Sequence, residues 1–198
     1  MPIKKNFEII SKHNLYQGFF CITQYTLKHR LFLGGWSQIL KRELFTRGQV
    51  TGVLPFDPIT EQVVLIEQFR LGALAQDNPW LLECVAGIVE EETPESAAKR
   101  ELKEEAGLVL QNLMPIYQYW VSPGGSDEFM SLFCGKVDAK LAAGIHGSEE
   151  EGEDIQVVTM SAQEAFDTVK SGEINNAMTI IALQWLELNY HEVLKKWK

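Results

Sequence analysis

The sequence contains little cysteine, no long apolar run and no repeated or low-complexity tract. Its three cysteines, Cys21, Cys84 and Cys134, are far apart and form no CxxC pair, so we expect buried, reduced thiols and not a disulfide framework or a zinc site. No apolar run approaches the ~18 residues of a membrane span. The N-terminal stretch MPIKKNFEII has no signal-peptide pattern. These absences predict a cytoplasmic protein without a membrane partner.

Positive charge is also scarce. The 198 residues include 18 Lys and Arg against 27 Asp and Glu, which gives a net charge of −9 and a pI near 5.0. Because nucleic-acid phosphates would be repelled, we expect no nucleic-acid partner. An anionic small substrate remains compatible with this charge, provided that its site supplies cations. The length suits one medium domain, or a core domain with a small appendage.

Several motifs of nucleotide and hydrolase chemistry are missing. The four histidines form no ligand-spaced pair, and no convincing Ser-His-Asp set is present. No stretch resembles a P-loop or a dinucleotide-binding GxGxxG.

The apolar pattern changes near Thr51. Before it, pieces such as GFFCITQYTL and SQILKRELFT alternate apolar and polar residues around a Gly34-Gly35 turn signal, a pattern typical of antiparallel strands. After it the character changes to denser apolar runs, such as QVVLIEQF and WLLECVAGIV.

Three helices are predicted among these strands. Thr93 as N-cap, proline at the first helical position and Gly107 as a left-handed stop predict a helix over Pro94–Ala106. A capping box at Ser161 opens a second helix that ends near Gly172. A third begins near residue 176, with an apolar side formed by Ile180, Leu183, Trp185, Leu186 and Leu188. This order favours an α+β fold over a doubly wound parallel sheet.

The stretch KRELKEEAGL needs a physical explanation, because three glutamates crowd into the first of these helices. On a helical wheel Glu101, Glu105 and Glu104 lie at about 0°, 40° and −60°, and both lysines lie on the opposite side. Only Glu104 has a basic partner at helical spacing, Arg100. Each like-charged pair costs a few tenths of a kcal/mol. Either this is a solvated acidic face, or the carboxylates bind a divalent cation such as Mg²⁺ or Mn²⁺.

Residues 86–108, AGIVEEETPESAAKRELKEEAGL, resemble the Nudix box: glycine, five residues, glutamate, seven residues, then Arg-Glu-aliphatic-x-Glu-Glu-x-Gly-aliphatic. The match holds from Glu92 to Leu108. Gly87 departs, because four residues and not five separate it from Glu92. Stretches along almost the whole chain, among them LPFDP, VVLIEQFR, SPGG and GIHG, are similar to the bacterial ADP-ribose pyrophosphatase branch of the Nudix hydrolases.

The resemblance implies a fold and an assembly. The expected fold is an α+β Nudix α/β/α sandwich with a mixed sheet, preceded by a small N-terminal antiparallel β domain. Residues 1–50 would form this dimerisation domain, exchanged between two subunits, and residues 51–198 the Nudix domain. A homodimer with shared active sites follows from that exchange.

The resemblance also implies a magnesium site, with Mn²⁺ as an alternative. Its oxygen donors would be the carbonyl of Ala86 and the carboxylates of Glu101, Glu105 and Glu153, with Glu104 on the same face. Arg100 and Glu92 would hold the glutamates in place. The catalytic base would come from the loop GSEEEGEDI, residues 147–155, where Glu151 occupies the matching position and Glu149 and Glu150 are alternatives.

Substrate contacts are implied at five further positions. Arg70 and Arg42 match residues that contact the diphosphate or the nucleotide, for which the guanidinium fork is suited. Phe19 matches an aromatic residue near the adenine. Glu43 and Glu128 would contact the nucleoside or the terminal ribose.

Taken together, the resemblance implies Mg²⁺-dependent hydrolysis of ADP-ribose to AMP and ribose 5-phosphate. One alternative is another nucleoside diphosphate sugar, such as GDP-mannose, because the box specifies pyrophosphate chemistry and not the leaving group. A second alternative is a non-catalytic nucleotide-binding Nudix module. The intact carboxylates of the box count against the latter.

Overall fold

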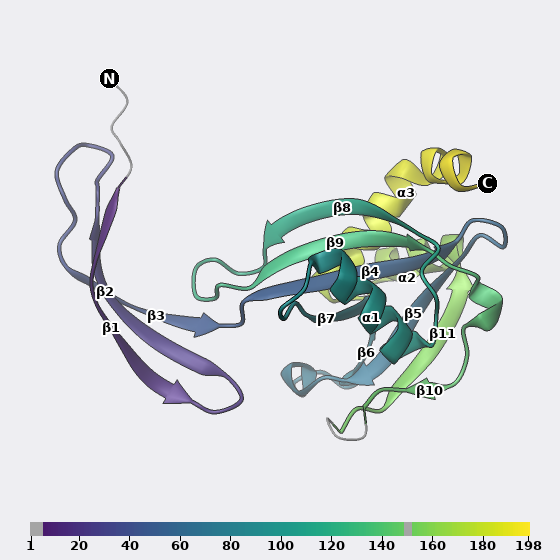
Figure 1. Ribbon diagram of the computed structural model, residues 1–198, viewed down its shortest axis with the longest axis horizontal. Helices are drawn as coiled ribbons and strands as arrows, with labels where there is room; N and C mark the ends of the chain where they lie inside the picture. Colours follow the sequence, from purple (N-terminus) through teal and green to yellow (C-terminus); the bar gives the residue numbers. More distant parts are fainter. Residues whose placement is uncertain (1–5, 149–151) are drawn as a thin grey trace. The chain divides into compact units, whose positions relative to one another are not determined.

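The computed structural model describes residues 6–148 and 152–198, and the chain divides into two compact units. The first unit runs to Gln49 and also contains residues 120–129, a segment that a division at residue 50 leaves in the second. The second unit contains Val50–Tyr119 and Met130–Lys198. Figure 1 labels the helices and strands of both units.

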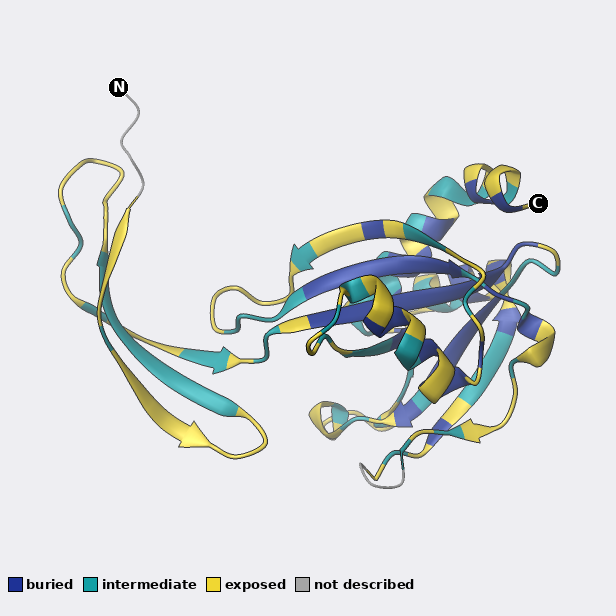
Figure 2. Cartoon of the chain, viewed as in Figure 1, coloured by how far each residue is buried: buried dark blue, intermediate teal, exposed yellow. Residues whose placement is uncertain are grey.

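The first unit is built on a three-stranded antiparallel sheet of β1 (Phe7–Gln17), β2 (Cys21–His29) and β3 (Leu40–Thr46), in that order. The predicted antiparallel strands are thereby confirmed. Gly34 and Gly35 both have positive φ, at 92° and 81°, as the turn signal requires. No residue of the three strands is buried, and Figure 2 shows no dark blue in them.

The second unit is built on an eight-stranded mixed sheet in the order β10-β11-β5-β4-β9-β8, with β6 paired to β5 and β7 to β4. Strands β4 and β5 at its centre are almost entirely buried, as Figure 2 shows. The strands are β4 (Gln49–Asp57), β5 (Gln62–Phe69), β6 (Trp80–Glu83), β7 (Val85–Ile88), β8 (Asn112–Trp120), β9 (Phe129–Lys136), β10 (Ile145–His146) and β11 (Ile155–Ser161).

Helices cover both faces of this sheet. Alternate residues of β5 point to opposite faces: Val64 and Ile66 pack with apolar residues of α1 (Pro94–Ala106), whereas Val63 and Leu65 pack with those of α2 (Ala162–Ser171) and α3 (Ala177–Trp197). In Figure 1, α1 lies in front of the sheet and α2 behind it. The predicted α+β fold, an α/β/α sandwich with a small N-terminal antiparallel sheet, is confirmed.

The helix boundaries also follow the predicted signals. Ser161 and Asn176 cap α2 and α3 by accepting hydrogen bonds from Glu164 and Thr179 N–H groups. One part of the prediction is wrong: Leu188, assigned to the apolar side of α3, is 84% exposed. It follows the fully buried Leu186 by two residues, about 200° around the helix, and therefore points away from the core. Among the described helices, none is both long and apolar enough to cross a membrane.

Candidate active site

Helix α1 is fixed at both ends. The Thr93 side chain accepts a hydrogen bond from the Ser96 N–H, proline occupies the first turn, and Gly107 ends the helix in the left-handed region at φ 65°. The Thr51 hydroxyl of β4 donates to the Pro94 carbonyl at 3.0 Å, which ties the first turn to the sheet. These contacts set the rotation of α1, and hence the direction of its glutamates.

The three crowded glutamates occupy three environments. Glu105 is buried, with 4% of its surface exposed, whereas the side chains of Glu101 and Glu104 are 13% and 56% exposed. Glu105 and Glu101 are drawn inward because α1 packs on the sheet through the fully buried Ala98, Leu102 and Ala106. The face is therefore partly buried, and a fully solvated acidic face does not describe it.

Glu105 carries the largest perturbation in the site. Its pKa is raised to about 8, chiefly by burial and also by the charges of Glu101 and Glu153, while the Ala86 N–H and the charge of Arg70 oppose the rise. The Ala86 N–H donates to Glu105 Oε2 at 3.1 Å. The charges of Glu101 and Glu153 thus act on Glu105, and repulsion of this kind favours binding of a cation.

Gly87 explains how Glu101 reaches this position. Gly87 lies in β7, and a Cβ at this position would overlap the Glu101 carboxylate and its side-chain carbons. The carboxylate therefore lies directly against the glycine backbone, where other residues have a side chain. The glycine of the shortened loop is required for close approach, although its φ is not in the left-handed region.

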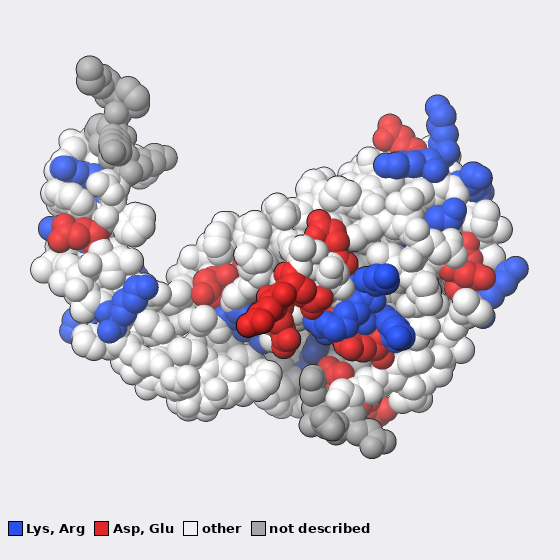
Figure 3. Space-filling view, viewed as in Figure 1, with Lys and Arg blue, Asp and Glu red and all other residues white. Residues whose placement is uncertain are grey.

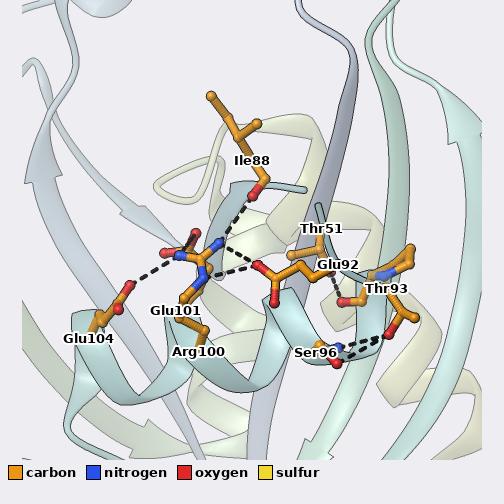
Figure 4. Close-up of polar contacts among 9 residues, drawn as sticks. Thr51, Ile88, Glu92, Thr93, Ser96, Arg100, Glu101 and Glu104 are labelled. Atoms are coloured by element: carbon orange, nitrogen blue, oxygen red, sulfur yellow. Dashed lines mark hydrogen bonds and ion pairs between the residues drawn. The ribbon is translucent and has the colours of Figure 1, made fainter. Parts of the chain in front are cut away.

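Arg100 connects four acceptors (Figure 4). Its Nη1 donates to Glu101 at 2.7 Å and to Glu104 at 3.1 Å. Nε and Nη2 donate to one oxygen of Glu92 at 3.0 and 2.9 Å, and Nη2 also donates to the Ile88 carbonyl at 3.2 Å. The wheel argument left Glu101 without a basic partner, and this was wrong, because the long arginine side chain reaches the adjacent residue. In Figure 3, acidic and basic groups lie side by side on this face of the second unit.

Glu153 is held by its own loop. Its Oε2 accepts from the Ser148 N–H at 3.1 Å, and its N–H donates to the Ser148 carbonyl at 3.0 Å. A Cβ at Gly147, which has φ 105°, would come 2.7 Å from Glu153 Cβ. Glu149, Glu150 and Glu151 lie outside the described residues, so the assignment of Glu151 as base stays a prediction.

The donor set suits a hard divalent cation in its chemistry. The carboxylates of Glu101, Glu105 and Glu153 and the Ala86 backbone come from α1, β7 and the loop before β11. Each carboxylate accepts a hydrogen bond from the protein. Within residues 6–148 and 152–198, no three acidic, histidine or cysteine side chains are grouped closely enough to hold a metal without rearrangement.

The remaining predicted residues lie apart from α1 in the chain. In the second unit, Arg70 donates from Nε to Glu83 at 2.7 Å. The other four belong to the first unit. Phe19 is 88% exposed and packs edge-on against Phe20, and Glu128 pairs with Arg47 at 3.4 Å. Arg42 and Glu43 lie on β3, where they pair with Tyr25 and Gln24 of β2.

Sequence reasoning missed two buried polar residues, Gln68 and Glu83, which are 5% and 7% exposed. Both end runs of consecutive apolar residues, VVLIEQ and WLLE. A carboxylate at the end of such a run was the available signal, because an acidic side chain is rarely buried without a partner.

Comparison with known proteins identifies the family. A model of the NUDIX domain matches residues 46–179. The chain belongs to the Nudix family. This Nudix protein is 46% identical to the ADP-ribose pyrophosphatase of Escherichia coli (strain K12) over 196 residues, which are 98% of this chain and 94% of that protein. The ADP-ribose pyrophosphatase of Haemophilus influenzae is 42% identical over 200 residues, 98% of this chain and 92% of that protein.

Two further likenesses are more distant. The GDP-mannose pyrophosphatase of Cronobacter sakazakii is 35% identical over 150 residues, 75% of this chain and 78% of that protein. A solved structure described as an ADP compounds hydrolase aligns with TM-score 0.71 at 18% identity, over 94% of this chain and 95% of that one. The latter likeness concerns the fold alone. The resemblance drawn from the box and its flanking stretches is confirmed.

Proposed function

We propose that this Nudix protein hydrolyses the pyrophosphate bond of ADP-ribose to give AMP and ribose 5-phosphate. The observation that carries the proposal is the 46% identity to an ADP-ribose pyrophosphatase over 98% of the chain. The packing of α1 supports it, because Glu101 and Glu105 are held together on the face that would meet the diphosphate.

Mg²⁺, with Mn²⁺ as an alternative, is the cation that we propose for this site. When bound, a divalent ion supplies charge that neutralises a diphosphate and lowers the pKa of water. The Ala86 carbonyl and the carboxylates of Glu101, Glu105 and Glu153 would hold it, with Glu104 adding negative charge nearby.

The chain's own residues would hold the acidic side chains in position, contact the diphosphate and accept a proton. The Ala86 N–H fixes the rotamer of Glu105, and Arg100, held by Glu92, limits the positions open to Glu101. Arg70 would contact the diphosphate, since a guanidinium can meet two oxygens at once. Glu151 would accept the proton of the attacking water.

Hydrolysis of competing nucleotide sugars tests the substrate. AMP release from ADP-ribose, measured beside GDP-mannose and NADH with Mg²⁺, should give the highest kcat/KM for ADP-ribose. Faster turnover of GDP-mannose would favour the second candidate function, which the 35% identity to a GDP-mannose pyrophosphatase supports. No turnover of any of them would favour a non-catalytic nucleotide-binding module.

A homodimer is the assembly that we propose. In the described part of the first unit no residue is buried, yet Phe7, Ile10, Tyr16, Phe32 and Leu33 are large, apolar and exposed. A three-stranded sheet needs a packed apolar face for stability, and a second copy of the chain would provide one. In such a dimer Phe19, Arg42 and Glu43 of one subunit would serve a site in the other, and Glu128 would complete it.

Mixing two inactive variants tests the shared site. Arg42→Ala and Glu105→Gln homodimers should each have low activity, and subunit exchange should produce mixed dimers with one intact site. About a quarter of wild-type activity is expected in an equimolar mixture. No recovery, in mixtures that mass spectrometry shows to contain mixed dimers, would mean that each site is built from one subunit.

We also place the activity in the cytoplasm. All three cysteines are free, and Cys84 and Cys134 are buried, which fits a reducing compartment. Fractionation of the native host cells, followed by detection of the protein in the soluble or membrane fraction, tests this location.

A further inference from the structure

Glu83 is a buried carboxylate beside the proposed site, without a role in the chemistry described so far. It ends β6, where it lies directly opposite Ile66 of β5. Residues directly opposite one another in antiparallel strands point to the same face of the sheet. Because Ile66 packs with the apolar residues of α1, Glu83 also points to the face that carries the site.

Two donors converge on one oxygen of Glu83. Arg70 Nε donates to Oε2 at 2.7 Å, and Gln68 Nε2 donates to the same atom at 3.4 Å. Gln68 is 5% exposed and is diagonal to Glu83 in the β5–β6 ladder. The carboxylate is therefore held from the sheet on one side and by Arg70 on the other.

The backbone around Glu83 is fixed by the start of α3. The side-chain amide of Asn176 donates to the Leu82 carbonyl at 2.6 Å, and the Thr179 hydroxyl accepts from the Cys84 N–H at 2.8 Å. The residues on both sides of Glu83 are thus anchored. Its carboxylate consequently has a defined position from which to orient a partner.

The contact with Glu83 leaves most of the Arg70 guanidinium available. Only Nε is used; within the part of the chain that the structure describes, Nη1 and Nη2 donate no hydrogen bond. The Arg70 side chain is 43% exposed, and its charge reaches the Glu105 carboxylate. The two free nitrogens are therefore open to a ligand, and a guanidinium can donate to two phosphate oxygens at once.

A buried ion pair such as Glu83–Arg70 is by itself weak evidence of a stabilising role. Burial raises the pKa of Glu83, and the charge and hydrogen bond of Arg70 and the hydrogen bond of Gln68 oppose the rise. Replacing a buried ion pair by apolar residues of similar size is often neutral or stabilising. A buried carboxylate that holds a half-exposed arginine is better explained by orientation of that arginine.

We propose that Glu83 is a positioning residue for Arg70: by accepting from Nε, it directs Nη1 and Nη2 toward the diphosphate of the substrate. Gln68 supports it by fixing the oxygen that Arg70 contacts. This inference rests on the proposed hydrolysis of a nucleoside diphosphate sugar. It predicts that Glu83 acts on turnover through Arg70 alone.

A double-mutant cycle tests that dependence. kcat/KM for ADP-ribose is measured for wild type, Glu83→Gln, Arg70→Ala and the double variant, all at saturating Mg²⁺. Glu83→Gln should lower kcat/KM roughly 10- to 100-fold, as expected for a misplaced contact group, and the double variant should match Arg70→Ala within about twofold. A double variant that falls by the product of the two single losses would overturn the proposal.

Glu67→Gln is the matched control. Glu67 precedes Gln68 in β5 and therefore points to the opposite face, so kcat/KM should stay at the wild-type value. Folding of Glu83→Gln is checked by circular dichroism and thermal unfolding. If this variant does not fold, Gln68→Met takes its place in the double-mutant cycle with Arg70→Ala. Gln68→Met should lower kcat/KM in the wild-type background and not with Arg70→Ala; equal losses in both backgrounds would overturn the proposal.

Failure of the inference and of the proposed function are distinguishable. Wild-type protein that does not hydrolyse ADP-ribose contradicts the proposed function. The cycle is then measured with the nucleotide sugar that the wild type does hydrolyse, and its additivity still decides the role of Glu83. Additive losses on an active wild type contradict the role of Glu83 alone.

Discussion

The two faces of the central sheet are formed by the same strands but bury different kinds of side chain. Behind it, α2 and α3 cover a continuous apolar core that includes Leu65, Leu132 and Leu186. In front of it, α1 covers a smaller apolar core around Ile66 and Leu102. The polar side chains of Gln68, Glu83 and Glu105 are also buried there, 5%, 7% and 4% exposed. Among the described residues, Glu83 and Glu105 thus add buried acidic side chains to the front face.

The comparison shows where the residues of the proposed site lower the stability of the fold. A buried carboxylate loses its hydration, and unless it is paired the free energy of unfolding falls. The front face accepts this cost at Glu105, whose pKa is raised to about 8 by burial and by like charges. Substitutions of the polar residues in front should therefore lower activity. Substitutions of the apolar residues behind should lower the free energy of unfolding.

The largest expected effect is that of Glu105→Gln. The amide keeps the acceptor for the Ala86 N–H but removes a metal-binding charge, so turnover should fall by more than about 100-fold, beyond the usual loss for residues that only support a ligand. The free energy of unfolding without metal should stay equal or rise. Steady-state kinetics at saturating Mg²⁺ and urea titration with EDTA measure the two quantities.

Glu95→Gln is the control for this substitution, because Glu95 lies in the exposed first turn of the same helix. Its turnover should equal that of the wild type. Unchanged turnover of Glu105→Gln at saturating Mg²⁺ would contradict the catalytic assignment and revive the nucleotide-binding module.

Leu186→Ala on α3 should have the reverse signature. Leu186 is fully buried, and removal of such a side chain typically costs about 2–5 kcal/mol of unfolding free energy. Well below its melting temperature the variant should keep the wild-type kcat/KM. The exposed Leu188 provides the control, since Leu188→Ala should change neither quantity measurably.

Local signals in the sequence predicted much of the fold. Caps at Thr93 and Ser161 and the left-handed stop at Gly107 gave the helix ends, because each satisfies backbone groups within a few residues. The box spacing placed Glu101 and Glu105 on one face, because residues four apart lie on the same side of a helix. The prediction for Leu188 was wrong because a stretch of apolar residues was assigned to one side without following the helical turn.

Long-range contacts could not be read from spacing. The partnership of Arg100 with Glu92, eight residues away, depends on how the loop folds back. Glu83 meets Arg70 only because β5 and β6 pair in one register, which the sequence does not specify by itself. The approach of Glu101 to Gly87 likewise depends on the docking of α1 against β7.

Paired glycines on the two faces sharpen the comparison further. A Cβ at Gly87 would displace the end of the flexible Glu101 side chain in front, whereas a Cβ at Gly52 would come 2.6 Å from Met178 behind. Gly87→Ala should therefore lower kcat/KM roughly 10- to 100-fold with little change in stability. Gly52→Ala should destabilise by about 1–3 kcal/mol and keep its activity. The same signature in both variants would contradict the division between the faces.

The smallest expected effect is at Asp57, a buried carboxylate that we assign to the structure and not to the site. Asp57, 3% exposed, accepts N–H hydrogen bonds from Ile59, Thr60 and Ala139. Burial alone would raise its pKa, but the Thr60 side chain and these N–H groups together lower it below its ordinary value of 3.8. Asp57 therefore adds stability above its unfolded-state pKa, and loses it as the pH falls through the lower folded-state pKa.

Asp57→Asn should consequently lower the free energy of unfolding by about 1 kcal/mol at pH 7. Because the asparagine does not titrate, the gap to the wild type should shrink as Asp57 becomes protonated in acid. Urea titrations of both proteins from neutral pH down to about pH 3 measure that gap. A gap that stays constant would mean that Asp57 acts through shape alone, and one that widens in acid would mean that its pKa is raised like that of Glu105.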